Sequence, residues 1–210
     1  MWSYRLVAPY TFERSEVLPR SPESLGDRQV LLRFLAAGIC GSDLPGFRGT
    51  QGRVPGDTGR CAAEKEGFPI HEVVGEVLAS RHPEHHAGDR VVGWASGFDG
   101  LMEQVVADGD GLTSYDRALR PEHAVALQPL ACVLYAVEQL PDLTGRHVAV
   151  LGQGSIGLLF SYVAKVAGAA QVTGVDPVDR LLGEEVARVG RVVAGRPVQR
   201  GNGRLDRFGD

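Results

Sequence analysis

The stretch Val148–Gly157 constrains the fold of this chain more than any other part of its sequence. Its residues, Val-Ala-Val-Leu-Gly-Gln-Gly-Ser-Ile-Gly, are typical of a buried strand, a glycine turn and the start of a helix. In such a turn Gly152 permits the tight bend, Gly154 lets the backbone approach a pyrophosphate, and Gly157 lets the helix pack on the strand. The stretch therefore predicts the phosphate-binding part of a dinucleotide-binding fold.

Two neighbouring features point to the same ligand. The N-terminus of the following helix, at Ser155 and Ile156, offers unpaired N–H groups and the positive end of the helix dipole to phosphates. A second strand, Gln171–Val175, ends in Asp176, which is placed to hydrogen-bond a ribose hydroxyl. Glycines that serve only a turn are the alternative, and they would not explain an acid at this place. Since a carboxylate repels a 2′-phosphate, the sequence favours NAD over NADP.

The composition limits the partners that the chain can have. Of 210 residues, 43% are hydrophobic and 23% are charged, which is typical of a folded chain with one large or two small domains. A net charge of −4 without a basic stripe argues against nucleic acid, and no apolar run approaches the roughly 20 residues that span a bilayer. The N-terminus lacks a signal peptide and the three cysteines form no disulfide framework, so we expect a cytoplasmic protein that acts on a small molecule.

The pattern along the chain predicts two domains, residues 1–118 and 119–210. The first has short strand-like runs broken by glycine, proline and aspartate, as in a small β-barrel or sandwich: Val30–Phe34, Glu72–Leu78, Arg90–Val92 and Met102–Val106. The second begins with a helical stretch and continues as strand, helix (156–167), strand and helix (about 177–189), which predicts a parallel βαβ layer. Residues 192–194 offer one more strand before a flexible tail. The three histidines within 82–86 are interpreted as a solvated turn rather than a metal site.

Two residues far apart in the sequence are candidate metal ligands. Cys40 lies in the glycine-flanked stretch Gly38–Asp43, and His71 opens a strand-like run that contains Gly75. Thiolate and imidazole suit zinc, and a catalytic zinc takes three protein ligands and keeps one open position. Taken singly, Cys40 would be a small buried residue and His71 a core histidine. Their combination ahead of a nucleotide-binding motif favours a metal site.

These motifs, in this order, resemble those of the zinc-dependent medium-chain dehydrogenase/reductase family, which includes the alcohol and polyol dehydrogenases. The resemblance covers roughly residues 2–188 and rests on several stretches: Gly38–Asp43, His71–Gly75, Gly88–Val91, Asp99–Glu103, Gln128–Ala131 and Val150–Gly154. It implies an α/β plus all-β fold, with an N-terminal GroES-like β-barrel followed by a partial Rossmann domain. A zinc-free reductase of the quinone or enoyl type is the less favoured reading, because the cysteine, histidine and glutamate of the zinc enzymes are all present.

The resemblance also implies roles for individual residues. Cys40 and His71 match the first two ligands of one catalytic zinc, and Glu72 matches the acid beside the metal. Ser42 matches the hydroxyl that passes the substrate proton toward solvent. Together with NAD, such a site transfers hydride between a secondary alcohol, or its ketone, and nicotinamide.

The chain departs from the family at the third ligand. Gln128 occupies that position, where relatives carry cysteine or glutamate, and its neutral carbonyl oxygen is a poorer ligand than an anion. Glu72 could compensate, and Cys132, one helical turn further on, is another candidate, although we interpret it as a small buried helix residue. Pro45 stands where many relatives carry a histidine of the proton relay. The four-cysteine lobe of a structural zinc is missing, since only residues 95–99 separate Trp94 from Gly100.

The second departure is length, because family members run well beyond 300 residues. An open sheet of two or three parallel strands leaves an edge and an apolar face, which a second copy or another chain would cover. The alternative function is therefore a shortened relative without redox turnover. Such a protein would bind a nucleotide or a partner, or perform non-redox chemistry on a small metabolite.

Overall fold

The computed structural model describes residues 1–49, 65–178 and 191–194. The chain divides into two units, Met1–Pro129 and Leu130–Asp210, each described here by itself. This division falls later than the predicted boundary after residue 118, because Ala124, Val125 and Leu127 pack against Val74 and Val92 of the first unit. Most of the predicted helix near 177–189, the loop around Cys61 and the tail from residue 195 lie outside the described residues.

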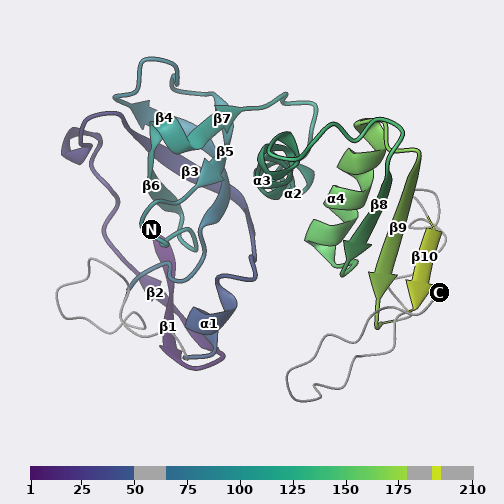
Figure 1. Ribbon diagram of the computed structural model, residues 1–210. Coiled ribbons are helices and arrows are strands. Elements are labelled where there is room, and N and C mark those ends of the chain that lie inside the picture. The colour runs from purple at the N-terminus through teal and green to yellow at the C-terminus, as the bar shows by residue number, and fades with distance from the viewer. Residues whose placement is uncertain (50–64, 179–190, 195–210) are drawn as a thin grey trace. The chain divides into compact units, whose positions relative to one another are not determined.

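The first unit contains a five-stranded antiparallel sheet and a separate hairpin (Figure 1). The sheet has the order β6-β3-β4-β5-β7, formed by Gln104–Asp108, Gln29–Gly38, Glu72–Ser80, Arg90–Trp94 and Leu112–Ser114. The hairpin pairs β1 (Trp2–Ala8) with β2 (Thr11–Glu16). Three of the predicted strand runs thus occur where expected, whereas β6 begins at Gln104 because Met102 forms only an isolated bridge with Ser3.

Alternating apolar residues of this sheet form its core. The largest cluster is made of side chains that are almost completely buried: Val30, Leu32, Val73, Val77, Val91, Ala95, Met102, Val105, Ala107 and Leu112. Because side chains alternate between the two faces of a strand, the residues between these core positions point to the opposite face of the sheet. Each fully buried valine or leucine contributes about 1.5–3 kcal/mol relative to exposure.

Short helical segments connect the strands. They are η1 (Pro22–Ser24), α1 (Leu44–Phe47), η3 (Gly109–Gly111), α2 (Pro121–Ala124) and the longer α3 (Leu127–Glu138). Pro45 lies at the first turn of α1, where its missing N–H costs no helical hydrogen bond. None of the helices in the described ranges is long and apolar enough to cross a bilayer.

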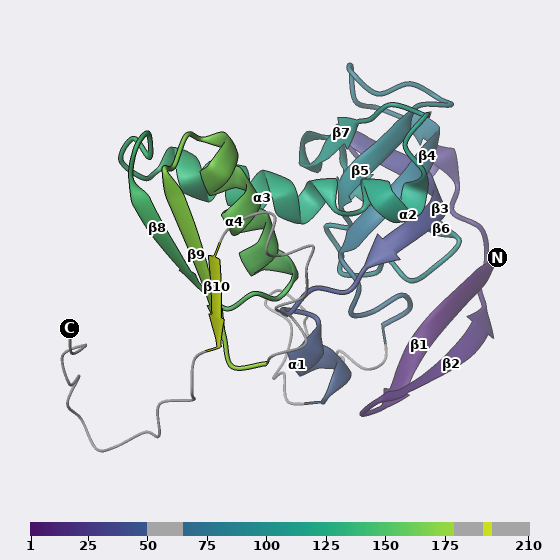
Figure 2. The same cartoon turned by 90° about the vertical axis from the view of Figure 1, so that its right-hand side faces the viewer.

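The second unit contains a parallel sheet with the order β10-β9-β8 (Figures 1 and 2). Its strands are β8 (His147–Leu151), β9 (Gln171–Asp176) and β10 (Arg191–Ala194), and α4 (Ser155–Val166) joins the first two. Ala164 of α4 packs with Ala169 and Val172 against partly buried side chains of β8. The predicted strand–helix–strand unit and the additional strand near residues 192–194 are confirmed.

Candidate metal and dinucleotide sites

Gly38, Glu72 and Trp94 lie side by side on the neighbouring strands β3, β4 and β5, close to the candidate metal ligands. Glu72 is the register partner of Gly38 on one side and of Trp94 on the other. Residues directly opposite each other point to the same face of a sheet, so the glutamate side chain lies over Gly38. A Cβ atom at residue 38 would overlap the Glu72 carboxylate and approach Val125 Cγ2 to 3.0 Å. Gly38 therefore leaves the space that this carboxylate occupies.

Asp43 joins the two candidate ligands that come from different parts of the chain. Its Oδ1 lies 2.5 Å from His71 Nδ1, and its Oδ2 accepts a hydrogen bond from the backbone N–H of Cys40 at 2.8 Å. The side chains of Asp43 and His71 are 1% and 3% exposed. When Nδ1–H donates to the carboxylate, the other ring nitrogen, Nε2, is the one with a free lone pair.

The resulting geometry is that of a possible metal site. Ligand atoms of Cys40, His71 and Glu72 all lie within 4.8 Å of one another. Tetrahedral zinc holds sulfur, nitrogen and oxygen ligands at about 2.0–2.3 Å, so small rotations of these side chains bring all three within reach of one ion. The donor set and the spacing therefore fit a zinc ion.

The pKa values of the two buried groups are shifted upward. The hydrogen bond to Asp43 raises the pKa of His71, although burial acts in the opposite direction. Burial raises the pKa of Glu72, while the hydrogen bond from Cys40 and the nearby imidazole lower it. Because a metal requires deprotonated ligands, an ion at this site competes with protons, and its affinity rises with pH.

Aromatic side chains surround the imidazole. The rings of Trp94 and Phe98 each have their centroids 5.1 Å from that of His71 and are tilted against it. Trp94 is 43% exposed, so part of an apolar surface next to the ligand group faces solvent. Phe98 has a positive φ of 55°, an uncommon conformation for a bulky residue, within the short loop that replaces the four-cysteine lobe.

Gln128 lies beside this group, with its amide between Glu72 Oε1 and the indole Nε1 of Trp94. In the amide orientation that satisfies both ends, the oxygen accepts a hydrogen bond from the indole Nε1–H of Trp94. The amide nitrogen then donates to Glu72 Oε1 at 3.0 Å. Gln128 and Glu72 are 7% and 6% exposed, so the amide and the carboxylate have little access to water, whereas Trp94 is 43% exposed. Its role as third ligand stays a prediction, and Glu72 supplies the anionic group within the cluster.

The glycine turn of the second unit has the conformation that its sequence predicts. Gly152 has a φ of 92°, and a Cβ atom at Gly157 would overlap the Gly152 carbonyl oxygen and lie 2.8 Å from its carbon. A Cβ atom at Gly154 would meet nothing within 4 Å, which leaves that side of the turn open. The first helical hydrogen bond is from Leu158 N–H to Gly154 O, so the N–H groups of the residues between them face the open N-terminus.

Asp176 and Gln153 hold this turn in place. The Asp176 carboxylate accepts hydrogen bonds from the backbone N–H of Gln153 at 2.6 Å and of Val178 at 2.8 Å. The fully buried Gln153 side chain donates to Val150 O and Gly152 O and accepts from Ser161 Oγ. The acid predicted for a ribose thus also fixes the loop predicted for the pyrophosphate.

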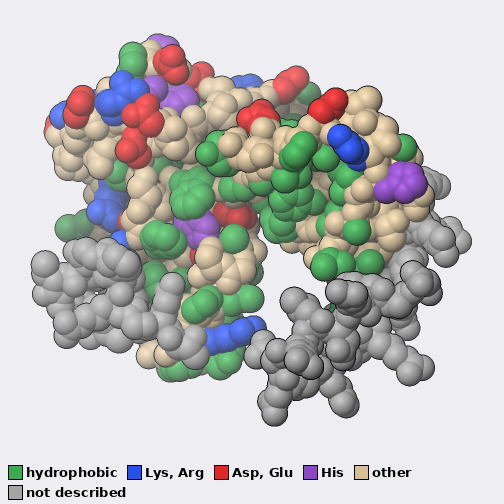
Figure 3. Space-filling model, in the orientation of Figure 1, with side chains coloured by type: hydrophobic (Ala, Val, Ile, Leu, Met, Phe, Trp, Pro, Cys, Tyr) green, Lys and Arg blue, Asp and Glu red, His purple; other side chains and the backbone are tan. Residues whose placement is uncertain are grey.

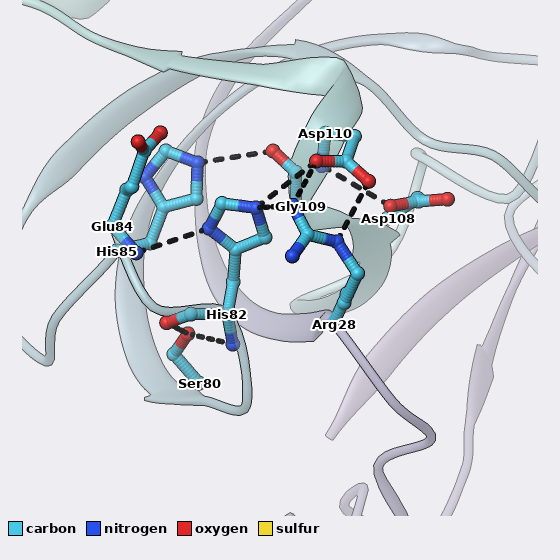
Figure 4. Close-up of polar contacts among 8 residues, drawn as sticks. All are labelled: Arg28, Ser80, His82, Glu84, His85, Asp108, Gly109 and Asp110. Atoms are coloured by element: carbon cyan, nitrogen blue, oxygen red, sulfur yellow. Dashed lines mark hydrogen bonds and ion pairs between the residues drawn. The ribbon is translucent and has the colours of Figure 1, made fainter.

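A second histidine cluster lies in the first unit (Figure 4). His82 and His85 are each 6% exposed and their rings stack at 4.7 Å. His82 accepts from the Glu84 N–H and lies 3.1 Å from an Asp110 carboxylate oxygen, while Arg28 forms a two-pronged ion pair with Asp110. The interpretation as a solvated turn is therefore wrong for these two histidines and holds for the exposed His86. Sequence spacing gave no sign of their partners in distant segments.

The remaining predicted residues differ in their surroundings. Ser42 is exposed next to the buried Asp43, as a hydroxyl in contact with solvent would be. Cys132 is exposed in α3, so its interpretation as a buried residue is wrong. The contacts of Asp43 and Trp94 with His71 were not predicted from the sequence. Asp43 stands in the same short motif as Cys40, which is the signal that could have found it.

These features define a class of protein: a GroES-like unit with a candidate metal site and a Rossmann unit with a dinucleotide turn. Residues 26–119 match the family model described as the alcohol dehydrogenase GroES-like domain. The chain belongs to the zinc-type medium-chain alcohol dehydrogenase family. The predicted fold class is thereby confirmed.

Three relatives illustrate the similarity. L-threonine 3-dehydrogenase of Pyrococcus horikoshii is 28% identical over 176 residues, which are 73% of this chain and 50% of that protein. (R,R)-butanediol dehydrogenase of Bacillus subtilis is 30% identical over 176 residues, 70% of this chain and 51% of that protein. The structure of alcohol dehydrogenase TADH from Thermus sp. ATN1 superposes with a TM-score of 0.72 at 25% identity, covering 91% of this chain and 62% of that one. The chain spans about half the length of the curated relatives it matches.

Proposed function

We propose that this protein is a zinc-dependent, NAD-linked dehydrogenase that interconverts a secondary alcohol, including polyols, and its ketone. The observation that carries the proposal is the approach of Cys40, His71 and Glu72 to within 4.8 Å, although Cys40 and His71 are distant in sequence. Relatives named for butanediol, sorbitol and threonine dehydrogenation support a substrate with a hydroxyl on a secondary carbon.

The three clustered residues would hold the metal. Cys40 would supply a thiolate, His71 its Nε2 and Glu72 a carboxylate oxygen, and Asp43 would orient the imidazole through Nδ1. A zinc ion bound there would supply a Lewis acid that polarises a carbonyl oxygen or lowers the pKa of an alcohol. The exposed Ser42 would pass the alcohol proton toward solvent, and the exposed part of Trp94 would contact apolar parts of the substrate.

The second unit would bind the dinucleotide. The open side of Gly154 and the N–H groups at Ser155, Ile156 and Gly157 would receive the pyrophosphate at the positive end of α4. Asp176, whose carboxylate is already held by two backbone N–H groups, would accept a hydrogen bond from a ribose hydroxyl. Because its charge would repel a 2′-phosphate, NAD is favoured over NADP.

A second candidate function is ligand binding without redox turnover. It needs only the candidate metal cluster and the glycine turn, both of which lie within the described residues. Zinc and nucleotide would then bind to a protein that leaves the nicotinamide unreacted. The two candidates differ in turnover, not in metal content.

Metal analysis and a cofactor titration test the proposal. Purified protein is loaded with zinc, dialysed and measured by emission spectrometry, NAD affinity is measured by calorimetry, and NADH formation is followed with butane-2,3-diol, sorbitol and threonine. We expect one zinc per chain, a fall in zinc content in Cys40→Ser, and no change in the control Cys132→Ser, whose cysteine is exposed in α3. Zinc and NAD binding without NADH formation would favour the second candidate. Protein that retains no zinc would refute the metal site.

A further inference from the structure

Gln153, in the turn that precedes α4, has a fully buried side chain although glutamine is polar. Its amide nitrogen donates to Val150 O at 3.2 Å and to Gly152 O at 3.1 Å. Its Oε1 accepts a hydrogen bond from Ser161 Oγ at 3.1 Å. Because a buried amide without partners is costly, these three hydrogen bonds fix its orientation. The amide therefore connects the end of β8 to the middle of α4.

The neighbouring strand leaves room for this amide. A Cβ atom at Gly174 of β9 would lie 2.5 Å from Gln153 Cδ and 2.7 Å from Gln153 Oε1. A side chain at residue 174 and the amide could therefore not occupy their places together. Gly174 is also the register partner of Val150, whose carbonyl oxygen accepts from the amide. The amide thus contacts both strands as well as α4.

The peptide group between Gly152 and Gln153 is held at both of its ends. Its carbonyl oxygen accepts from the Gln153 amide, and its N–H donates to Asp176 Oδ2 at 2.6 Å. Because a peptide group is planar, a rotation that moves its carbonyl oxygen also moves its N–H. The other carboxylate oxygen of Asp176 accepts from Val178 N–H at 2.8 Å. One of the two anchors of Asp176 is thus a peptide that the Gln153 side chain orients.

We propose that Gln153, held by Ser161, is a positioning residue that keeps the Asp176 carboxylate directed at the adenosine ribose of the dinucleotide. The proposal rests on the cofactor assignment of the proposed function. It gives a role in ligand binding to Ser161, a buried hydroxyl of α4 that lies beyond the glycine motif. Because Gln153 acts through Asp176, its contribution to NAD affinity is limited to that of the carboxylate.

A double-mutant cycle on NAD affinity tests this proposal. Calorimetry measures the Kd of NAD for the parent protein, Gln153→Leu, Asp176→Asn and the double variant. A charge-assisted hydrogen bond contributes about tenfold to affinity, so we expect a loss of about that size in each single variant. In the Asp176→Asn background, Gln153→Leu should cause no further loss, because the charge that it positions has been removed. Losses that multiply would show that Gln153 does not act through Asp176 and would overturn the proposal.

Ser161→Ala is a smaller change, which keeps the test decisive if Gln153→Leu does not fold. It removes the hydroxyl that donates to Gln153 Oε1 and should raise the Kd of NAD about threefold. Tyr162→Phe is the control, because it removes an exposed hydroxyl from the adjacent residue of α4, and it should leave this Kd unchanged.

The Kd of NADP separates positioning from a general loosening of the second unit. A carboxylate that has moved away from the ribose also repels a 2′-phosphate less, so Ser161→Ala should not weaken NADP binding. A merely structural role would weaken the binding of both cofactors equally. Equal losses for NAD and NADP, or an unchanged Kd of NAD in Ser161→Ala, would overturn the proposal. Parent protein that binds no NAD would overturn the cofactor assignment itself, and this proposal with it.

Discussion

Replacing Gly38 by alanine should weaken metal binding without unfolding the protein. The new Cβ atom would lie less than 3.0 Å from Glu72 Oε2, and ordinary contact begins at 3.4 Å, so the carboxylate must retreat by at least 0.4 Å. Metal–ligand distances tolerate about ±0.2 Å, so this retreat takes Glu72 out of bonding position. Because the displaced group is the end of a flexible side chain, the expected cost to folding is small, about 1 kcal/mol, whereas zinc affinity should fall about 10–100-fold.

Gly41→Ala is the matched control for this substitution. A Cβ atom at residue 41 would meet nothing within 4 Å, although Gly41 belongs to the same short motif around Cys40. Zinc affinity is measured by chelator competition, and stability by thermal unfolding of metal-free protein. We expect parent-like affinity in Gly41→Ala and a selective loss in Gly38→Ala. Equal zinc affinity in Gly38→Ala and the parent would refute the reasoning that Glu72 is a ligand confined by Gly38.

Four further substitutions test the dinucleotide site and the buried Asp99. Gly157→Ala should destabilise the second unit by several kcal/mol, because its Cβ atom would overlap the backbone of Gly152. Gly154→Ala should leave Tm unchanged and weaken NAD binding, because its Cβ atom meets nothing within 4 Å on the side open to the ligand. Equal effects of the two variants in thermal unfolding and in calorimetry would contradict this. Asp176→Asn should weaken NAD binding about tenfold by calorimetry, since it removes the charge offered to a ribose hydroxyl, and an unchanged Kd would exclude that role. Burial raises the pKa of Asp99, whose Oδ1 has no hydrogen-bond partner, so its ionisation opposes folding above the pKa of the unfolded chain. Asp99→Asn should therefore raise the unfolding free energy by roughly 1 kcal/mol at pH 7. The gain should disappear at about pH 2, well below the ordinary aspartate pKa of 3.8, because Asp99 is then protonated in both states, and a gain that persists there would contradict this.

The parts of the fold that sequence could predict are those with local signals. The turn at Gly152 and the close approach at Gly157 depend on residues within one short motif, and both appear in the structure as expected. Cys40 and His71 were found because each stands in its own recognisable motif. The structure adds that their ligand atoms approach each other.

The surroundings of Gln128, His82 and His85 could not be predicted from the sequence, because they depend on contacts between segments that are distant along the chain. The orientation of the Gln128 amide follows from the register that places Trp94 opposite Glu72, and no spacing along the chain encodes that register. His82 and His85 looked like part of a solvated turn, because their partners, Asp110 and the carbonyl of Gly109, come from η3. Burial of a polar residue becomes visible only when its partner is known.

X-ray absorption at the zinc edge of the loaded protein tests the central claim most directly. We expect one sulfur, that of Cys40, at about 2.3 Å from zinc and nitrogen or oxygen ligands at about 2.0–2.1 Å, with the sulfur contribution lost in Cys40→Ser. A zinc surrounded by nitrogen and oxygen alone in the parent protein would contradict it.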